Sequence, residues 1–220
     1  SMRISPPSRP HSQFALPKAA NSTCSVWTQT EMLVSIGAST GGPVAVAKLL
    51  KIWTPPAHCA LVIVQHIDLA FTDSFAQWLA AQINFPIQVI ENNTPVTPGK
   101  MFIAKTNDHL LLDERQCFRY SPNPIDYSYR PSVDVFFHGI ARYWQRQAIG
   151  VLLTGMGRDG AEGLLAMRKA KKLTIAQDQA SSAVYGMPRA AADIQAAEKI
   201  LSLEAIGQAL IQHAGPKPGQ

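Results

Sequence analysis

Three polar residues that could build a hydrolytic site each follow a short apolar run, and Ser39 is the first of them. It lies in Gly37-Ala-Ser-Thr-Gly-Gly42, directly after the strand-like residues 32–36. This run matches G-x-S-x-G, in which a serine occupies a tight turn between a strand and a helix. N–H groups at the start of that helix could stabilise an oxyanion, so Ser39 is a candidate nucleophile. A phosphate-binding glycine loop or a plain surface turn would fit the same residues.

A serine hydroxyl needs a base to become nucleophilic near neutral pH, and the chain has six histidines. His66 emerges at the carboxyl end of the apolar run 59–64, beside the expected position of Ser39. The other five lie in a leading linker, near the C-terminus, before a strand, at the start of a short strand and inside a helix: His11, His213, His58, His109 and His138. His66 is therefore the candidate base, although a structural histidine would be the simpler interpretation if Ser39 stood alone.

A carboxylate follows a third apolar run, in Thr154-Gly-Met-Gly-Arg-Asp-Gly160. Asp159 could orient the imidazole of His66 and stabilise its protonated form, which would complete a Ser-His-Asp triad. The chain order Ser39, His66, Asp159 differs from the Ser…Asp/Glu…His order of α/β-hydrolases. A different family of serine hydrolases is therefore required.

The same glycine-rich run has a competing interpretation. Gly155, Gly157 and Gly160 spell a dinucleotide-binding fingerprint, and the acid Asp178 lies at about the expected distance. This fingerprint usually opens its domain, whereas here it follows two-thirds of the chain. It also leaves the candidate nucleophile and base unexplained. We prefer the triad and keep a dinucleotide-binding oxidoreductase domain as the alternative.

Short apolar runs alternate with helical patterns from residue 32 onward, which predicts an α/β fold. The runs are predominantly apolar on both faces, as expected of strands buried on both sides, so we predict a doubly wound, mainly parallel sheet with helices on both faces. Short segments within 87–120 predict a small antiparallel addition. Thr72 and Ser132 are candidate helix caps. The expected main strands are 32–36, 59–64, 149–154 and 173–177, and the expected later helices are 161–170 and 203–211.

The 220 residues, 46% of them apolar, are enough for one substantial core. We predict a Pro-rich basic linker at 1–30, a catalytic domain at 31–213 and a C-terminal tail at 214–220. The net charge is +5, but three of those charges lie in the predicted linker, and the remaining +2 gives no sign of nucleic-acid binding. No apolar run approaches 18 residues, which argues against insertion into a membrane.

The chain has three widely spaced cysteines: Cys24, Cys59 and Cys117. An odd number without metal-ligand spacing predicts neither a disulfide framework nor a zinc site. It suits a reducing cytoplasm, where disulfides are rare.

Several motifs together resemble the catalytic domain of the CheB protein-glutamate methylesterases, in order and from about residue 32 to about residue 210. They are Ile36–Gly42, Gln65-His66, Arg130-Pro-Ser-Val-Asp134, Leu153–Gly160 and Gly186-Met-Pro-Arg189. The run Leu173–Pro188 is most similar to the branch known as WspF, which is attached to Wsp-type surface-sensing systems.

The resemblance implies a cytoplasmic hydrolase that removes methyl esters from glutamate side chains on chemoreceptor helices, in some members with deamidation of glutamines. It places the nucleophile on Ser39, the base on His66 and the acid on Asp159, and it implies no metal and no organic cofactor. Thr40 and the backbone around Met156 fall on positions associated with the oxyanion or with substrate placement.

Family members normally carry an N-terminal receiver domain that blocks the active site until it is phosphorylated. The resemblance therefore implies that this chain is the effector half of a response regulator controlled by a histidine kinase. Two further alternatives stay open: a catalytically silent scaffold of the same fold, and a serine hydrolase acting on small esters.

Overall fold

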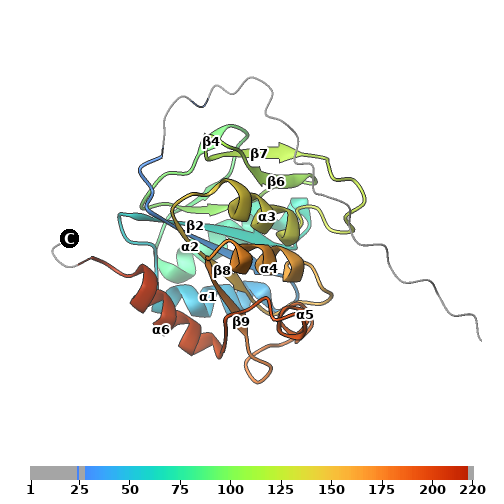
Figure 1. Ribbon diagram of the computed structural model, residues 1–220. Coiled ribbons are helices and arrows are strands. Elements are labelled where there is room, and N and C mark those ends of the chain that lie inside the picture. Colours follow the sequence, from blue (N-terminus) through green and yellow to red (C-terminus); the bar gives the residue numbers. More distant parts are fainter. Residues whose placement is uncertain (1–23, 25–27, 218–220) are drawn as a thin grey trace, which may run out of the picture.

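Seven parallel strands form the central sheet of the computed structural model, which describes Cys24 and residues 28–217 (Figure 1). Their order is β10-β9-β8-β1-β2-β5-β3, and every pairing is parallel. The strands are β1 (Met32–Ala38), β2 (Cys59–Gln65), β3 (Ile87–Val89), β5 (Met101–Ile103), β8 (Gln147–Leu152), β9 (Leu173–Gln177) and β10 (Lys199–Leu201). The predicted α/β fold with a mainly parallel sheet is confirmed.

The central strands β1 and β2 are apolar except for Ser35 and Gln65, because both of their faces are covered. Every residue of β1 and β2 is buried. Successive side chains alternate between two cores, so that Leu33 packs into one and Val34 and Ile36 into the other. Burial on both faces is what a continuous apolar run of strand length predicts.

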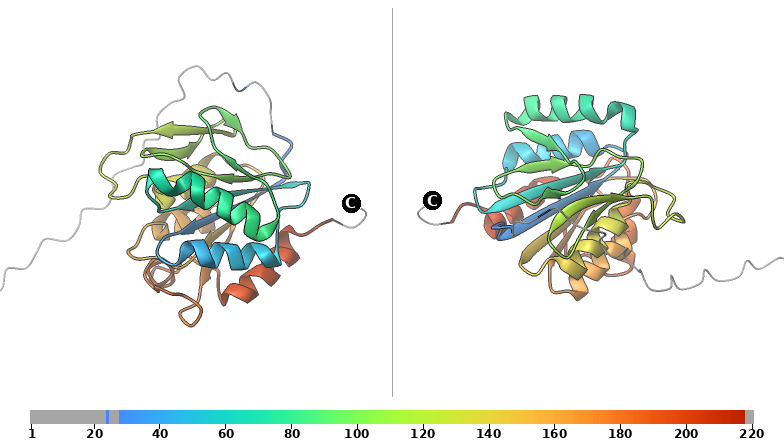
Figure 2. Two further views of the ribbon diagram at one scale, coloured as in Figure 1. Left: turned by 180° about the vertical axis from the view of Figure 1, so that it is seen from behind. Right: turned by 90° about the horizontal axis from the view of Figure 1, so that it is seen from above.

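Helices cover both faces of the sheet, as Figure 2 shows from two directions. Three of them, α1 (Gly42–Ile52), α2 (Leu69–Ile83) and α6 (Leu203–Ala214), pack together on one face. On the other face lie α3 (Val133–Tyr143), α4 (Ala161–Lys169) and α5 (Met187–Asp193). Within the described part of the chain, none of these helices is long and apolar enough to cross a membrane.

A second, three-stranded sheet packs against α3 (Figure 1). It is formed by β4 (Thr94–Pro95), β7 (Cys117–Ser121) and β6 (His109–Leu112), in that order and antiparallel. The predicted antiparallel addition is therefore present but smaller than the range 87–120. Within that range β3 and β5 join the parallel sheet, where β5 is completely buried.

The structure corrects one of the two predicted helix caps. Ser132 caps α3, with its hydroxyl accepting a hydrogen bond from the N–H of Val135. At α2 the cap is Asp68, whose carboxylate accepts from Ala70, and Thr72 lies inside the first turn. The helix begins earlier than predicted because an aspartate can cap as well as a threonine. The short elements β4, α5 and β10 were not predicted.

The prediction from the cysteines was wrong, because Cys24 and Cys117 form a disulfide across a sequence separation of 93 residues. Wide spacing did not exclude pairing, since the segment before β1 lies against the edge of the small sheet. There the hydroxyls of Thr28 and Thr30 donate to the carbonyl of Val96. The linker prediction for 1–30 falls mostly outside the described residues, but Cys24, Thr28 and Thr30 are buried. The cysteine count therefore no longer supports a reducing compartment.

Candidate active site

The three predicted site residues meet at the carboxyl edge of the parallel sheet. Ser39 directly follows β1, His66 directly follows β2, and Asp159 lies between β8 and α4. The strands are neighbours in the order β8-β1-β2 and end almost level, since Ala38 pairs with Gln65. The chain leaves β1 toward one face of the sheet and β8 toward the other, and ligands of doubly wound sheets bind at such a switch point.

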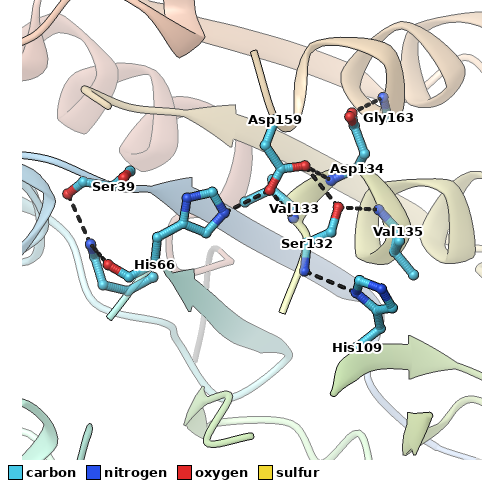
Figure 3. Close-up of polar contacts among 10 residues, drawn as sticks. Ser39, His66, His109, Ser132, Val133, Asp134, Val135, Asp159 and Gly163 are labelled. Atoms are coloured by element: carbon cyan, nitrogen blue, oxygen red, sulfur yellow. Dashed lines mark hydrogen bonds and ion pairs between the residues drawn. The ribbon is translucent and has the colours of Figure 1, made fainter. Parts of the chain in front are cut away.

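His66 and Asp159 form a short hydrogen-bonded pair, with 2.6 Å between Nε2 and Oδ2. Their side chains are only 9% and 4% exposed. The other ring nitrogen, Nδ1, is buried and has no hydrogen-bond partner among the described residues. Figure 3 shows Ser39 and Asp159 on opposite sides of the imidazole ring. The ring therefore presents an unused acceptor on the side of Ser39 when its proton is on Nε2.

The carboxylate of Asp159 is held by the N-terminus of α3 (Figure 3). It accepts hydrogen bonds from the Ser132 hydroxyl (2.7 Å), the Val133 N–H (2.7 Å) and the Asp134 N–H (3.0 Å). Burial by itself would raise the pKa of Asp159. The hydrogen bond and charge of His66, with the two helix N–H groups, outweigh burial and lower this pKa below its usual value. Asp159 is thus kept ionised as a partner for a protonated imidazole.

The starts of α3 and α4 are joined in both directions. Asp159, just before α4, accepts from the first N–H groups of α3, and Asp134 in the first turn of α3 accepts from N–H groups at the start of α4. Its carboxylate accepts hydrogen bonds from the N–H of Gly163, at 2.7 Å, and of Gly160. Burial, reinforced by the negative charge of Asp159, raises the pKa of Asp134 to about 7. Neither Asp134 nor Gly163 was singled out as a site residue in the sequence.

His109, set aside as a base, supports the site from a distance. Its Nδ1 accepts a hydrogen bond from the N–H of Ser132 (3.2 Å), and its Nε2 lies 2.8 Å from the carbonyl of Pro124. Burial lowers the pKa of His109, which favours a neutral ring with its proton on Nε2. A chain of contacts therefore runs from His66 through Asp159 and Ser132 to His109. The predicted helix cap at Ser132 was the only local signal for it.

Ser39 is positioned by its backbone. Its N–H donates to the carbonyl of Thr154 (3.0 Å), and its carbonyl accepts from the Gln65 side chain (2.8 Å). Gly41 caps α1 in the left-handed conformation, with φ at 76°. At Gly155 a Cβ atom would lie 2.7 Å from the Cβ of Ser39, so only glycine fits there.

Thr40 and Met156, the two residues predicted to place the oxyanion or the substrate, flank Ser39. Thr40 is exposed, and its carbonyl accepts a hydrogen bond from the buried Thr154 hydroxyl, at 3.0 Å. Met156 follows Gly155 and is 61% exposed. Their roles stay predictions. Thr40 directly precedes Gly41, the cap of α1, which makes no side-chain cap hydrogen bond, and Met156 follows the glycine that lies against Ser39.

An aromatic residue that the sequence did not indicate covers one face of the imidazole. Tyr129 stacks on His66 with ring centroids 4.4 Å apart and only 9° between the ring planes. It comes from the loop between β7 and α3 and is 42% exposed. The loop is polar and carries no periodic pattern, so no signal in the sequence pointed to this contact.

The residues of the dinucleotide alternative have local roles in the structure. Gly155 allows the close approach to Ser39, and Gly160 precedes α4. The Asp178 carboxylate accepts hydrogen bonds from the N–H and hydroxyl of Ser181, at 2.9 and 2.6 Å, within its own turn. In the part of the chain that the structure describes, no group of three or more His, Cys, Asp or Glu residues could hold a metal ion.

Comparison with known proteins gives one consistent family. The family model described as CheB methylesterase matches residues 34–210. A protein-glutamate methylesterase/protein-glutamine glutaminase of Pseudomonas aeruginosa is 50% identical over 182 residues, covering 83% of this chain and 54% of that protein. A relative of the same name from Cupriavidus metallidurans is 51% identical over 183 residues, again covering 83% of this chain and 54% of the relative. The chain thus spans about half the length of these relatives.

Among solved structures, the CheB methylesterase catalytic domain of Thermotoga maritima matches with a TM-score of 0.75 and 30% sequence identity. The match covers 82% of this chain and 97% of that domain. Family model, relatives and fold therefore agree over the region that holds Ser39, His66 and Asp159. The chain belongs to the CheB methylesterase family.

Proposed function

We propose that this chain hydrolyses methyl esters of glutamate side chains on chemoreceptor helices, with Ser39 as nucleophile, His66 as base and Asp159 as acid. The observation that carries the proposal is the imidazole of His66. Its Nε2 is bound to Asp159 at 2.6 Å, while its buried Nδ1 is unpartnered on the side of Ser39. A neutral imidazole in this setting has one acceptor left, and the serine hydroxyl is the group placed to use it.

The first half-reaction forms an acyl-enzyme. Ser39 Oγ attacks the ester carbonyl as its proton moves to Nδ1 of His66, and the imidazolium is stabilised by Asp159 through Nε2. The negative charge on the carbonyl oxygen is stabilised by backbone N–H groups around Thr40 and Met156 and by the N-terminus of α1. Methanol leaves with the proton from His66.

The second half-reaction releases the glutamate. Water attacks the acyl carbonyl as its proton moves to Nδ1 of His66, which then returns a proton to Ser39 Oγ. The bond between Ser39 and the acyl group breaks, and a free glutamate carboxyl is formed. No step in this sequence requires a metal or organic cofactor.

The names of the relatives also include glutaminase activity, which fits the same intermediate. Attack by Ser39 on a glutamine side chain would give the identical acyl-enzyme, with ammonia leaving instead of methanol. His66 would donate the proton that the departing amine requires. Deamidation of receptor glutamines is therefore the second reaction we propose for this site.

The parent protein, its partners and its location follow from the family and not from the geometry. We propose that a receiver domain phosphorylated through a histidine kinase controls access to the site, and that the protein acts in the cytoplasm on receptor tails. Membership of the WspF branch, and with it a surface-sensing pathway, stays a prediction.

The experiment that tests the proposal is release of methanol from methylated cytoplasmic fragments of chemoreceptors. We expect release by the wild-type chain and its loss in Ser39→Ala, with Ser121→Ala in β7 as a matched control that retains activity. Ammonia release from unmodified fragments tests the deamidation. Full activity of Ser39→Ala would contradict the proposal.

The same assay separates the two remaining alternatives. A hydrolase of small esters would cleave p-nitrophenyl acetate but release no methanol from any receptor fragment. A silent scaffold would do neither, although it would bind the fragments in a pull-down assay. Either result would overturn the assignment to receptor glutamates.

A further inference from the structure

We propose that Tyr129 is a positioning residue for the reaction: its ring holds the imidazole of His66 in the orientation that presents Nδ1 to Ser39. This inference rests on the proposed function, because the orientation of His66 matters for the reaction only if His66 is the base. It assigns that task to a residue outside the Ser-His-Asp triad.

The first observation is the geometry of the contact. The two rings are nearly parallel, with an interplanar angle of 9° and a centroid separation of 4.4 Å. This separation is within the range of favourable aromatic pairs. The tyrosine ring therefore covers one face of the imidazole, and the His66 side chain is only 9% exposed.

The second observation is that a single hydrogen bond holds the imidazole ring. It joins Nε2 to Asp159, because Nδ1 has no partner among the described residues. Rotation about the Cβ–Cγ bond, which this hydrogen bond opposes at one atom only, would move Nδ1 away from Ser39 and replace it with a carbon. The stacked ring opposes this rotation, because a tilted imidazole would collide with the face of Tyr129.

The third observation concerns how Tyr129 is placed across the site. A Cβ atom at Gly157 would lie 3.7 Å from its hydroxyl oxygen, so the side chain reaches from His66 to the loop that carries Asp159. The residue is nevertheless 42% exposed, and its own removal would leave no large buried cavity. Changes at Tyr129 therefore test the orientation of the base without dismantling the core.

The stack also matters for charge. His66 becomes positively charged when it accepts the proton of Ser39, and a tyrosine face attracts a cation. Asp159 stabilises this charge at one edge of the ring, and Tyr129 stabilises it across the face. The contribution is larger when the ring is charged, so it should appear in kcat more than in KM.

The kinetic test uses three substitutions and one control. Tyr129→Phe keeps the ring and should retain activity within about twofold of the wild type. Tyr129→Leu and Tyr129→Ala should lower kcat by roughly 10-fold, the smaller end of the loss that follows misplacement of a catalytic group, while KM changes less than twofold. Trp78→Ala, which removes an aromatic side chain of similar exposure (40%) from α2, should change neither.

The split between kcat and KM is a readout that a purely structural role would not move. Equal loss in Tyr129→Phe and Tyr129→Ala would overturn the proposal, and so would a rise in KM alone.

A measurement without substrate keeps this inference separate from the proposed function. The ring-current field of Tyr129 shifts the carbon-bound ring protons of His66 in the NMR spectrum. These shifts should persist in Tyr129→Phe and disappear in Tyr129→Leu, whether or not a substrate is known. Failure of methanol release with these shifts intact would count against the esterase only, whereas unchanged shifts in Tyr129→Leu would overturn the stacking role.

Discussion

The two sides of the candidate site are held in place by different means. On the acid side, the Asp159 carboxylate accepts hydrogen bonds from His66, the Ser132 hydroxyl and two N–H groups of α3. On the nucleophile side, Ser39 is fixed by hydrogen bonds of its backbone and by close contact with Gly155. No hydrogen bond joins its hydroxyl to His66 among the described residues.

This difference separates electrostatic from steric control. The acid side is buried and charged, so its function depends on which polar groups face Asp159 and on their protonation. The nucleophile side depends on backbone approach, so its function depends on the absence of side-chain atoms at Gly155. Substitutions on the two sides should therefore fail in different ways, and three predictions follow in order of expected effect.

The largest effect is expected on the acid side, from Asp159→Asn. The neutral amide cannot stabilise the protonated ring of His66, and kcat should fall by about 10³ to 10⁴-fold. The fold should survive, since an asparagine oxygen can still accept from the start of α3. Methanol release and thermal unfolding measure the two outcomes, with Asp178→Asn as the control. A loss below tenfold would show that the charge of Asp159 is not needed.

A smaller effect is expected on the nucleophile side, from Gly155→Ala. The added Cβ would lie 2.7 Å from the Cβ of Ser39 and 2.3 Å from the sulfur of Met187, so the serine must move. A displacement of about 1 Å typically costs about 100-fold in rate. The control is Gly99→Ala, in a remote turn with φ at 71°, where the new Cβ would make only an ordinary contact with the Ala57 backbone at 3.7 Å, and this change should cost stability but not activity. Wild-type kcat in Gly155→Ala would contradict steric control.

The smallest effect on rate, and a distinct effect of pH on stability, is expected for Asp134→Asn. Because the pKa of Asp134 is raised to about 7, the folded protein keeps a proton that the unfolded chain releases near pH 4. This group therefore makes the wild type less stable as pH rises from about 4 to about 7. The lowered pKa of Asp159 acts in the opposite sense, giving stability that is lost as pH falls through its folded value.

Asparagine keeps an acceptor for Gly163 but cannot ionise, so it removes only the contribution of Asp134. The Tm of the wild type should therefore fall relative to the Tm of Asp134→Asn as the pH rises from about 5 to about 8. Thermal unfolding across this range measures it, with Asp113→Asn as a control at another buried carboxylate. A difference that is constant with pH would show that Asp134 is already ionised at pH 5.

The parts of the site that follow strands could be predicted from the sequence. Ser39, His66 and Asp159 each follow a continuous apolar run, and parallel strands end at one common edge, so local patterns were enough to bring them together. The α/β fold followed from the same runs. The parallel pairing of β3 and β5 did not, because runs of three residues carry too little pattern to fix their partners.

The supporting contacts depend on tertiary packing that no local pattern encodes. The cap at Ser132 was predictable, but the anion bound at that helix start comes from Asp159, 27 residues away in sequence. The available signal was the start of a helix within Arg130-Pro-Ser-Val-Asp134, since the positive end of a helix binds anions. Tyr129 and the pairing of Cys24 with Cys117 had no comparable signal, because the partners meet only in the folded chain.

The measurement that tests the central claim most directly is covalent labelling of the nucleophile. A fluorophosphonate should react with the wild-type chain, and peptide mapping should place the adduct on Ser39. Labelling should be lost in Ser39→Ala and strongly slowed in His66→Ala, because the hydroxyl then has no base. An adduct on another serine, or labelling at the wild-type rate without His66, would contradict the assignment of nucleophile and base.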